Sequence, residues 1–162
     1  MKVLVLGLGN PILTDDGVGP HVAKELEDKL DENVTIMEAS LAGLNVLDLL
    51  VGYDRAIIID SIKTRGGKAG QIYRLDLGEF EVTRHAVSTH GVNLVTALEL
   101  GKMLGLDLPH KIDILAIEVA ETDRFGEECT PEVARAIPVC AGMIIDELKA
   151  GGAACTGDAA FD

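Results

Sequence analysis

The chain has 162 residues, enough for one domain with a sizeable core, and its 14 lysines and arginines against 27 aspartates and glutamates give a formal net charge of −13. This negative charge argues against nucleic acid or an anionic membrane surface as a partner, because both carry phosphate groups. No apolar run reaches the roughly 20 residues of a membrane-spanning helix, and the N-terminus lacks the pattern of a secretory signal, so we expect a cytoplasmic protein that acts as a monomer.

Strands and helices alternate from the start of the predicted fold. Residues 3–6 are apolar without alternation, which indicates a central strand buried on both faces of a sheet. Residues 18–30 carry apolar positions three to four apart and predict an amphipathic helix packed on that sheet. The β-branched residues of 33–37 predict a second strand, and 41–51 predict a second helix.

The middle of the chain adds a buried strand and an edge strand. Residues 56–59 are wholly apolar and are followed at once by Asp60, which indicates a third central strand. Apolar and polar residues alternate over 71–77, so we place this strand near an edge, where it could run antiparallel. The segment 78–89 lacks periodicity and is typical of a long loop, and such loops are more often functional than idle.

The last part of the chain continues the alternation. Residues 92–104 predict a helix, 111–119 a further strand and 120–129 a polar loop. A final helix over 131–149 begins with a proline in its first turn, and Pro138 inside it predicts a kink or an interruption.

Strands that alternate with helices imply crossover connections and a mostly parallel sheet. We therefore predict an α/β protein, a three-layer α/β/α sandwich around a mostly parallel, mixed central sheet. Residues 1–150 form its single domain, and 151–162, which carry no apolar stripe, form a disordered tail.

A sharp turn after the first strand leads to two adjacent acids. The sequence GLGNP favours a turn, and the DDG that follows suits the start of a helix. In an open α/β fold this arrangement places carboxylates at the carboxyl edge of the sheet, where ligands usually bind. The residues expected to shape this loop are Gly7, Gly9, Asn10, Asp15 and Gly17.

Three residues that could carry chemistry are Asp16, Asp60 and His90. They stand at strand ends or helix starts, and the carboxyl ends of parallel strands line one edge of a sheet, so their side chains could converge. Two carboxylates and an imidazole would form a small, open metal site for a borderline divalent ion such as nickel or zinc. The simpler interpretation is that the acids cap a helix or end a strand and the histidine only opens a helix.

The glycine turn also invites a dinucleotide-binding interpretation. A GxGxxG fingerprint needs a third glycine, and Ile12 stands in its place. Glu38 does lie at the end of the second predicted strand, where an acid would hold a ribose hydroxyl, so this alternative stays open.

The remaining histidines, serines and cysteines have less support as functional residues. His85 lies in the long loop and is a candidate functional residue, whereas His21 and His110 are expected to be ordinary, partly exposed residues. A serine nucleophile at Ser88 is disfavoured because no GxSxG turn surrounds it. A cysteine nucleophile is disfavoured because Cys129 follows two glutamates that would raise its pKa. The cysteines are odd in number, lack CxxC spacing and are expected to be free thiols: Cys129, Cys140 and Cys155.

The motifs LVLGLGNPILTDDGVG, IIIDS and STHGVNL, in this order over residues 1–150, resemble those of the nickel-iron hydrogenase maturation proteases. The resemblance implies an aspartic-type endopeptidase that removes a C-terminal extension from the precursor of the hydrogenase large subunit after nickel insertion. It further implies that Asp16, Asp60 and His90 bind nickel supplied by the substrate, that another divalent ion can occupy the site in vitro, and that cleavage is metal-assisted hydrolysis.

Two alternatives to this resemblance remain. One is a nickel-sensing chaperone that docks on the precursor without cutting it. The other is a peptidyl-tRNA hydrolase, whose opening GLGNP looks similar. In those enzymes a histidine-asparagine pair follows where this chain has Asp15-Asp16-Gly17, and the net charge of −13 also opposes binding to tRNA.

Overall fold

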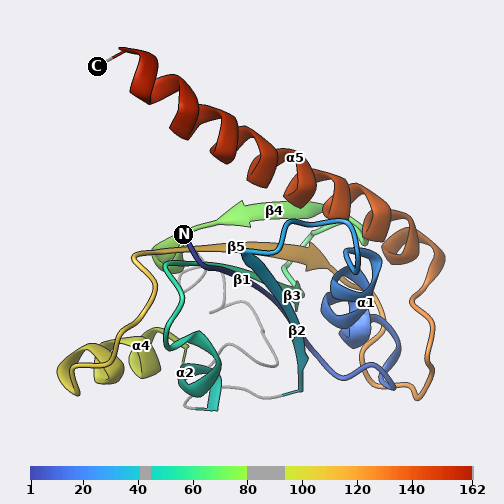
Figure 1. Cartoon of the computed structure of the whole chain (residues 1–162). Coiled ribbons are helices and arrows are strands. Elements are labelled where there is room, and N and C mark those ends of the chain that lie inside the picture. The colour runs from blue at the N-terminus through green and yellow to red at the C-terminus, as the bar shows by residue number, and fades with distance from the viewer. Residues whose placement is uncertain (41–44, 80–93, 162) are drawn as a thin grey trace.

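The computed structural model describes residues 1–40, 45–79 and 94–161. Within these residues five strands form one mixed sheet in the order β2-β1-β3-β5-β4 (Figure 1). The parallel strands are β1 (Val3–Leu8), β2 (Val34–Ala39), β3 (Arg55–Ile62) and β5 (Lys111–Glu118). Strand β4 (Ile72–Leu75) pairs antiparallel with β5 at the edge, as the alternating sequence predicts.

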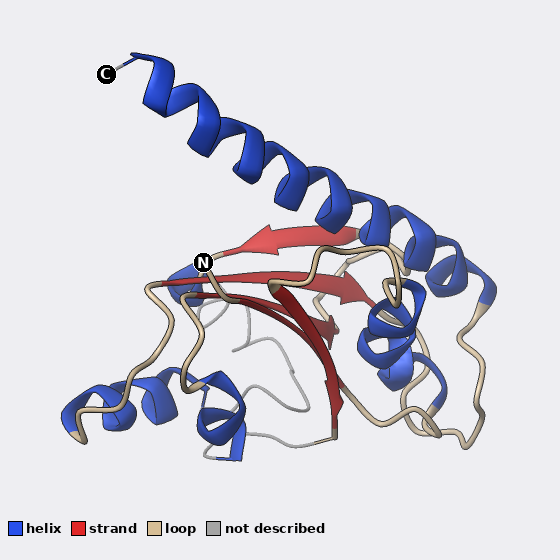
Figure 2. Cartoon of the chain, in the orientation of Figure 1, coloured by secondary structure: helices blue, strands red, loops and turns tan. Residues whose placement is uncertain are grey.

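Helices cover both faces of the sheet (Figure 2). Helices α1 (Val18–Glu25) and α5 (Pro131–Phe161) pack on one face, and α2 (Asn45–Leu50) and α4 (Leu94–Met103) pack on the other. Each face of the sheet has its own hydrophobic cluster, and the strands contribute side chains to both. Val5 of β1 packs with α1 on one face, whereas its neighbours Leu4 and Leu6 pack with α2 and α4 on the other. The predicted three-layer α/β/α sandwich is therefore confirmed.

The strand bounds differ slightly from the predicted ones. Strand β1 continues past residue 6 through Gly7 to Leu8, because Gly7 still pairs with both neighbouring strands. Strand β3 continues past Asp60 to Ile62 along its pairing with β5. Strand β2 begins and ends later than the predicted 33–37, and β4 and β5 are shorter than the predicted 71–77 and 111–119.

Helix α1 ends at Glu25, well before the predicted end at Leu30. Its amphipathic spacing continues further, but Asp28 takes a φ of 64°, a left-handed backbone conformation that a right-handed helix does not contain. The helix is thus stopped by the local backbone, whereas its apolar stripe would allow it to continue.

Helix α5 runs without interruption from Pro131 to Phe161, past the predicted end at Lys149. The predicted interruption at Pro138 is wrong. The ring of Pro138 is exposed, and so is Ala134 one turn earlier, whose carbonyl loses its helical partner but can be reached by water. Residues 151–161 are helical here, and that 151–162 form a disordered tail stays a prediction.

Several predicted elements lie partly outside the described residues. The helices predicted over 41–51 and 92–104 are described from Asn45 and Leu94 onward. Of the loop predicted over 78–89, only the first two residues are described, and both lie in a short helical turn.

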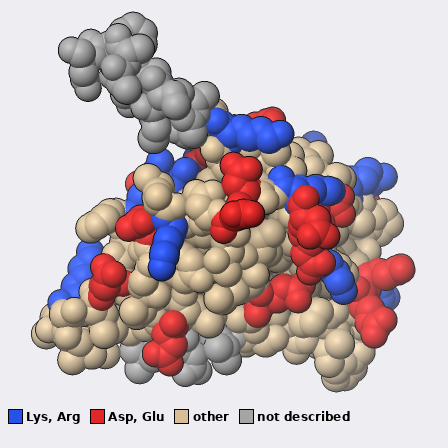
Figure 3. All heavy atoms as spheres, viewed as in Figure 1, with Lys and Arg blue, Asp and Glu red and all other residues tan. Residues whose placement is uncertain are grey.

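The surface carries charges of both signs, with acidic side chains in the majority in the sequence as a whole (Figure 3). Among the described residues, no helix combines the length and the apolar character needed to cross a membrane.

Candidate active site

Asp16 lies in η1 (Thr14–Gly17), the short 3-10 helix between β1 and α1, at the carboxyl edge of the sheet. Its side chain is buried, with 2% of the residue exposed. The Asn10 N–H donates to Asp16 Oδ2 at 2.9 Å, and the Ser61 hydroxyl donates to Oδ1 at 3.1 Å. Both contacts come from outside η1, so Asp16 does not act as a helix cap.

Asp60 is equally buried and lies inside β3, two positions before its last residue. Its Oδ1 accepts a hydrogen bond from the Ser61 N–H at 2.8 Å. Ser61 therefore joins the two acids, because its backbone N–H binds Asp60 and its hydroxyl binds Asp16. Ser61 thus contacts both predicted carboxylates, and Asp60 does not merely end a strand, because β3 continues to Ile62.

Ser61 is a residue of this site that the sequence patterns did not single out. It follows Asp60 directly, and residues next to each other on a strand point to opposite faces. In the sequence, a hydroxyl residue directly after the acid in IIIDS is the feature that could have pointed to Ser61. The contact with Asp16 could not be predicted, because the spacing of residues does not show how the turn after β1 places Asp16 next to the Ser61 hydroxyl.

Glycines permit the close backbone approach that positions Asp16. Gly9 has a φ of 145°, and a Cβ built there would lie 2.0 Å from the Asp16 carbonyl oxygen. A Cβ on Gly7 would lie 2.4 Å from the Gly19 carbonyl oxygen, and one on Gly17 would lie 2.8 Å from the Pro11 Cα. Since these contacts are to backbone atoms, a side chain at any of the three positions would displace the backbone that it faces.

Asp15 has a different environment from Asp16. Its fully buried carboxylate accepts hydrogen bonds from the backbone N–H groups of Ala120, Glu121 and Thr130, at 3.0, 2.9 and 2.7 Å. The Thr130 hydroxyl also lies within 3.0 Å of both carboxylate oxygens. Asp15 thus fastens the segment that leads from β5 into α5, which is a structural role.

The third predicted ligand, His90, lies outside the described residues. Within the described ranges no group of three or more histidine, cysteine, aspartate or glutamate side chains is arranged to hold a metal ion. The chemistry of Asp16 and Asp60 fits a divalent ion, because carboxylates supply oxygen ligands. The complete set of Asp16, Asp60 and His90 stays a prediction.

The other candidate residues that the structure describes have ordinary structural or exposed positions. His21 Nε2 lies 2.9 Å from the Glu127 carbonyl oxygen, so it links α1 to the segment before α5, and His110 is exposed. Burial raises the pKa of the Cys129 thiol to about 12, with a further contribution from the charge of Asp15. The expected raised pKa is therefore present, although its first cause is burial rather than the neighbouring glutamates. His85 and Ser88 lie outside the described residues.

Cys140 is buried as well, and burial raises the pKa of its thiol to about 12. Both Cys129 and Cys140 are free thiols, as expected. Neither thiol has the lowered pKa that a nucleophile needs at neutral pH.

Glu118 is a buried acid that the sequence patterns also missed. It ends β5, and its carboxylate accepts hydrogen bonds from the Thr64 N–H at 2.7 Å and the Tyr73 hydroxyl at 3.0 Å. Burial raises the pKa of Tyr73, and Glu118 raises it further, against a lowering by the contact with Thr64. Through these hydrogen bonds Glu118 holds the turn after β3 in place, so its role is structural.

The geometry does not favour a dinucleotide. The space beside Gly7 and Gly9 is filled by the protein's own backbone, and the helix start that would face a phosphate carries the buried acids Asp15 and Asp16. Negative charge at that position repels a pyrophosphate. Glu38 is exposed at the neighbouring strand end.

Known proteins resemble this chain over nearly its whole length. Residues 20–147 match the family model for hydrogenase maturation proteases. A hydrogenase 2 maturation protease of Escherichia coli strain K12 is 26% identical over 155 residues, covering 94% of this chain and 93% of that protein. The delta subunit of coenzyme F420 hydrogenase from Methanothermobacter thermautotrophicus is 26% identical over 158 residues, covering 91% of this chain and 94% of that protein.

A solved structure shows the same fold. The hydrogenase maturating endopeptidase HybD from Escherichia coli superimposes with a TM-score of 0.81 at 26% identity, covering 94% of both chains. The family match contains Asp60 and begins after Asp16, whereas the superposition spans almost the whole chain. The chain therefore belongs to the hydrogenase maturation protease family and is a peptidase.

Proposed function

We propose that this protein is an endopeptidase that cleaves the C-terminal extension from the nickel-loaded precursor of a nickel-iron hydrogenase large subunit. The observation that carries the proposal is the pair of buried acids, Asp16 and Asp60, joined through Ser61 at the carboxyl edge of the sheet. Membership of the maturation protease family supports the reaction and the class of substrate.

In this proposal nickel belongs to the substrate, and Asp16, Asp60 and His90 recognise it. The Asn10 N–H and the Ser61 hydroxyl each hold one oxygen of Asp16, which fixes the orientation of that carboxylate before the substrate arrives. Preorganised carboxylates bind a cation without reordering their side chains. A divalent ion bound there supplies Lewis acidity for hydrolysis of the adjacent peptide bond.

Single substitutions test the roles of the three residues. We expect Asp16→Asn, Asp60→Asn and His90→Ala each to lower the rate of precursor processing by at least about a hundredfold, because removing a metal ligand costs at least as much as removing one of its outer-shell partners, which costs roughly 10–100-fold. Asp48→Asn is the matched control, because Asp48 is an exposed acid on α2 and its loss should leave processing unchanged. Purified protein is incubated with nickel-loaded precursor, and the products are weighed by mass spectrometry.

The masses also separate cleavage from docking. Loss of one C-terminal peptide cannot arise from binding, so an unchanged precursor that co-purifies with the protein would support a nickel-sensing chaperone instead. Processing at the wild-type rate by all three variants would overturn the assignment of these residues. Repeating the assay with nickel-free precursor tests the recognition of nickel, and we expect no cleavage there.

A further inference from the structure

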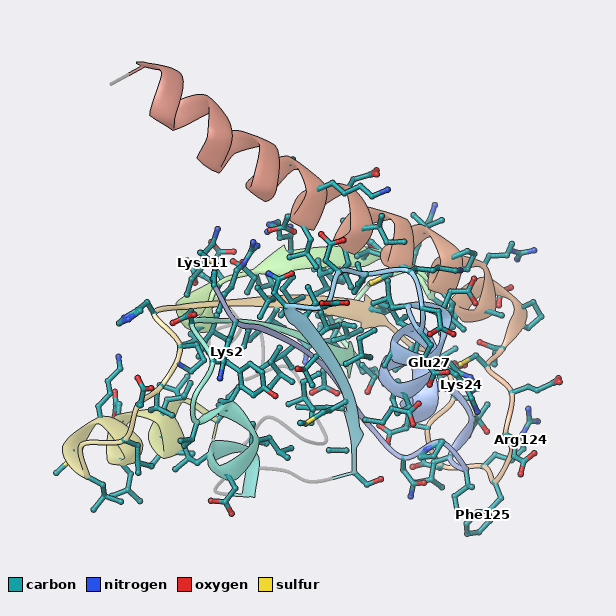
Figure 4. All side chains as sticks on the ribbon, in the orientation of Figure 1. Lys2, Lys24, Glu27, Lys111, Arg124 and Phe125 are labelled. Carbon is teal, nitrogen blue, oxygen red and sulfur yellow. The ribbon has the colours of Figure 1, made fainter. Side chains whose placement is uncertain are left out.

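Two apolar side chains stand exposed beside the candidate active site. Phe125 lies in the segment between β5 and α5 and is 78% exposed, and Ile12 lies in the loop between β1 and η1 and is 49% exposed. Figure 4 shows Phe125 at the outer end of its loop, pointing away from the ribbon, with Arg124 next to it. In a chain with only 3% aromatic residues, a phenylalanine held out into solvent is an unusual use of an apolar side chain.

The two loops that carry these side chains are fastened to each other. The Gly126 N–H donates to the Ile12 carbonyl and the Thr14 N–H donates to the Gly126 carbonyl, both at 2.9 Å. The carboxylate of Asp15 binds the other end of the Phe125 loop. Phe125 and Ile12 are thus presented by a constrained backbone, which lowers the entropic cost of using them as a binding surface.

This position adjoins the predicted catalytic acids. Gly126 bonds to Thr14, which lies two residues before Asp16 in the same short helix, η1. A partner that covers Phe125 and Ile12 would therefore lie against the carboxyl edge of the sheet, where Asp16 and Asp60 are buried.

The charges around Phe125 define what kind of partner fits. Asp123, Glu127 and Glu128 are exposed in the same segment, and no ion pair within the described ranges involves them. Arg124 is the one base among them. An apolar anchor flanked by carboxylates that make no ion pair with the described residues complements an apolar pocket with a basic rim. A second copy of this chain, with its net charge of −13, does not offer such a rim as readily.

We propose that Phe125 and Ile12 form a docking point for the hydrogenase large-subunit precursor, which seats Phe125 in an apolar pocket bordered by lysines or arginines. This inference rests on the proposed function, because that function names the precursor as the partner. Docking at this point would hold the precursor against the site edge while Asp16, Asp60 and His90 act on its nickel and its extension.

Substitution of the anchor tests the proposal. Phe125→Ala should raise both KM for processing and Kd for the precursor by about tenfold, as truncation of a binding hot spot does, and leave kcat within about twofold. The Kd is measured with Asp16→Asn present in every chain, so that no precursor is consumed. Met103→Ala is the matched control, because Met103 is 84% exposed on α4 and its loss should change neither constant.

The acidic rim has its own test. Glu127→Gln combined with Glu128→Gln should slow association with the precursor several-fold and flatten its dependence on salt, because rim charges act mainly on the association rate. Glu99→Gln, which removes an exposed acid from α4, should leave both unchanged.

The outcomes separate the two proposals. If Phe125→Ala keeps KM and Kd within about twofold of wild type, the docking point is wrong even though the peptidase assignment stands. If the wild-type chain binds the precursor without shortening it, the proposed function fails and the Kd comparison still decides the docking point. If the wild-type chain neither binds nor cleaves the precursor, both proposals fall.

Discussion

Two neighbouring acids, Asp15 and Asp16, are both buried but have separate tasks. Asp15 accepts hydrogen bonds from three backbone N–H groups of the segment between β5 and α5, whereas Asp16 contacts Asn10 and Ser61 at the candidate active site. A substitution at one position should therefore change stability, and a substitution at the other should change activity.

We expect Asp15→Ala to lower the free energy of unfolding by about 2–4 kcal/mol, because it leaves several buried N–H groups without an acceptor. Urea denaturation followed by circular dichroism measures this loss. Asp16→Asn keeps an acceptor oxygen for the Asn10 N–H and offers an NH2 group that the Ser61 hydroxyl can accept from, so it should cost less than about 1.5 kcal/mol. Equal stability of Asp15→Ala and wild type would show that the segment does not depend on this carboxylate.

At the scale of elements, Gly19 governs how closely α1 packs on the sheet. A Cβ on Gly19 would lie 2.4 Å from the Leu8 carbonyl oxygen and 2.6 Å from that of Ile59, so both β1 and β3 would have to move. Glycine is unfavourable inside a helix, and its presence in the first turn of α1 is the sequence signal of such a close approach.

We predict that Gly19→Ala lowers the free energy of unfolding by about 3 kcal/mol through this overlap with backbone atoms. Gly142→Ala is the matched control: Gly142 lies in α5, and beyond its chain neighbours and the backbone of its own helix turn no heavy atom of the described residues lies within 4 Å of the position that a methyl group there would take, so the change should stabilise the protein by about 0.5–1 kcal/mol. Thermal or urea unfolding of both variants tests the pair, and a stable Gly19→Ala would contradict the close packing of α1.

Glu147 connects α5 with two strands of the sheet. Its carboxylate pairs with Arg55 of β3 and Arg74 of β4, and Arg55 also lies 3.1 Å from Asp113 of β5. Burial alone would raise the pKa of Glu147, but the hydrogen bond from Arg74 and the charges of Arg55 and Arg74 outweigh it, so the pKa lies below its ordinary value of 4.5.

Because the pKa of Glu147 is lowered in the folded state, the free energy of unfolding decreases at acidic pH. The unfolded chain takes up the proton first, so the stabilisation by Glu147 is complete above about pH 5 and is lost as the pH falls through 4.5 toward the pKa of the folded state. We expect Glu147→Gln to cost about 1–2 kcal/mol at pH 7, between the values for exposed and buried pairs, and the difference from wild type to shrink below pH 4.5.

Urea midpoints measured from pH 3 to pH 7 test this dependence. Glu132→Gln is the control on the same helix, because the pair of Glu132 with Arg135 is exposed and spans 4.0 Å. It should change the free energy of unfolding by less than about 0.5 kcal/mol at any pH. A difference between Glu147→Gln and wild type that stays constant over the whole range would contradict the lowered pKa.

At the scale of the whole molecule, the features that depend on the periodicity of apolar residues could be predicted from the sequence. Apolar strands that alternate with amphipathic helices admit few arrangements, so the three layers and the antiparallel edge strand followed from the pattern. The placement of Asp60 near the carboxyl end of β3, and of Asp16 in the loop that follows β1, agrees with the rule that parallel strands end at one edge.

The remaining features depend on contacts between distant residues or on single backbone angles. The hydrogen bonds of Ser61 to two acids and of Asp15 to the segment before α5 leave no trace in the spacing of residues. The early end of α1 follows from the φ of Asp28, and the continuity of α5 follows from the exposure of Pro138. Such features are fixed by the assembled fold, which is why the pattern of the chain did not contain them.

The C-terminal part of α5 extends away from the rest of the molecule (Figure 1). Among the described side chains of α5, the buried ones lie from Val133 to Ile144, and Leu148 packs against the same core. A chain that ends at Ala150 should therefore keep its free energy of unfolding within about 1 kcal/mol, since a helix end that extends away from the domain contributes little. A chain that ends at Asp146 is the control, because it also loses Glu147 and Leu148 and should be less stable by about 2–4 kcal/mol. Urea unfolding of both chains decides the matter, and a large loss of stability on removing 151–162 alone would place those residues within the folded domain.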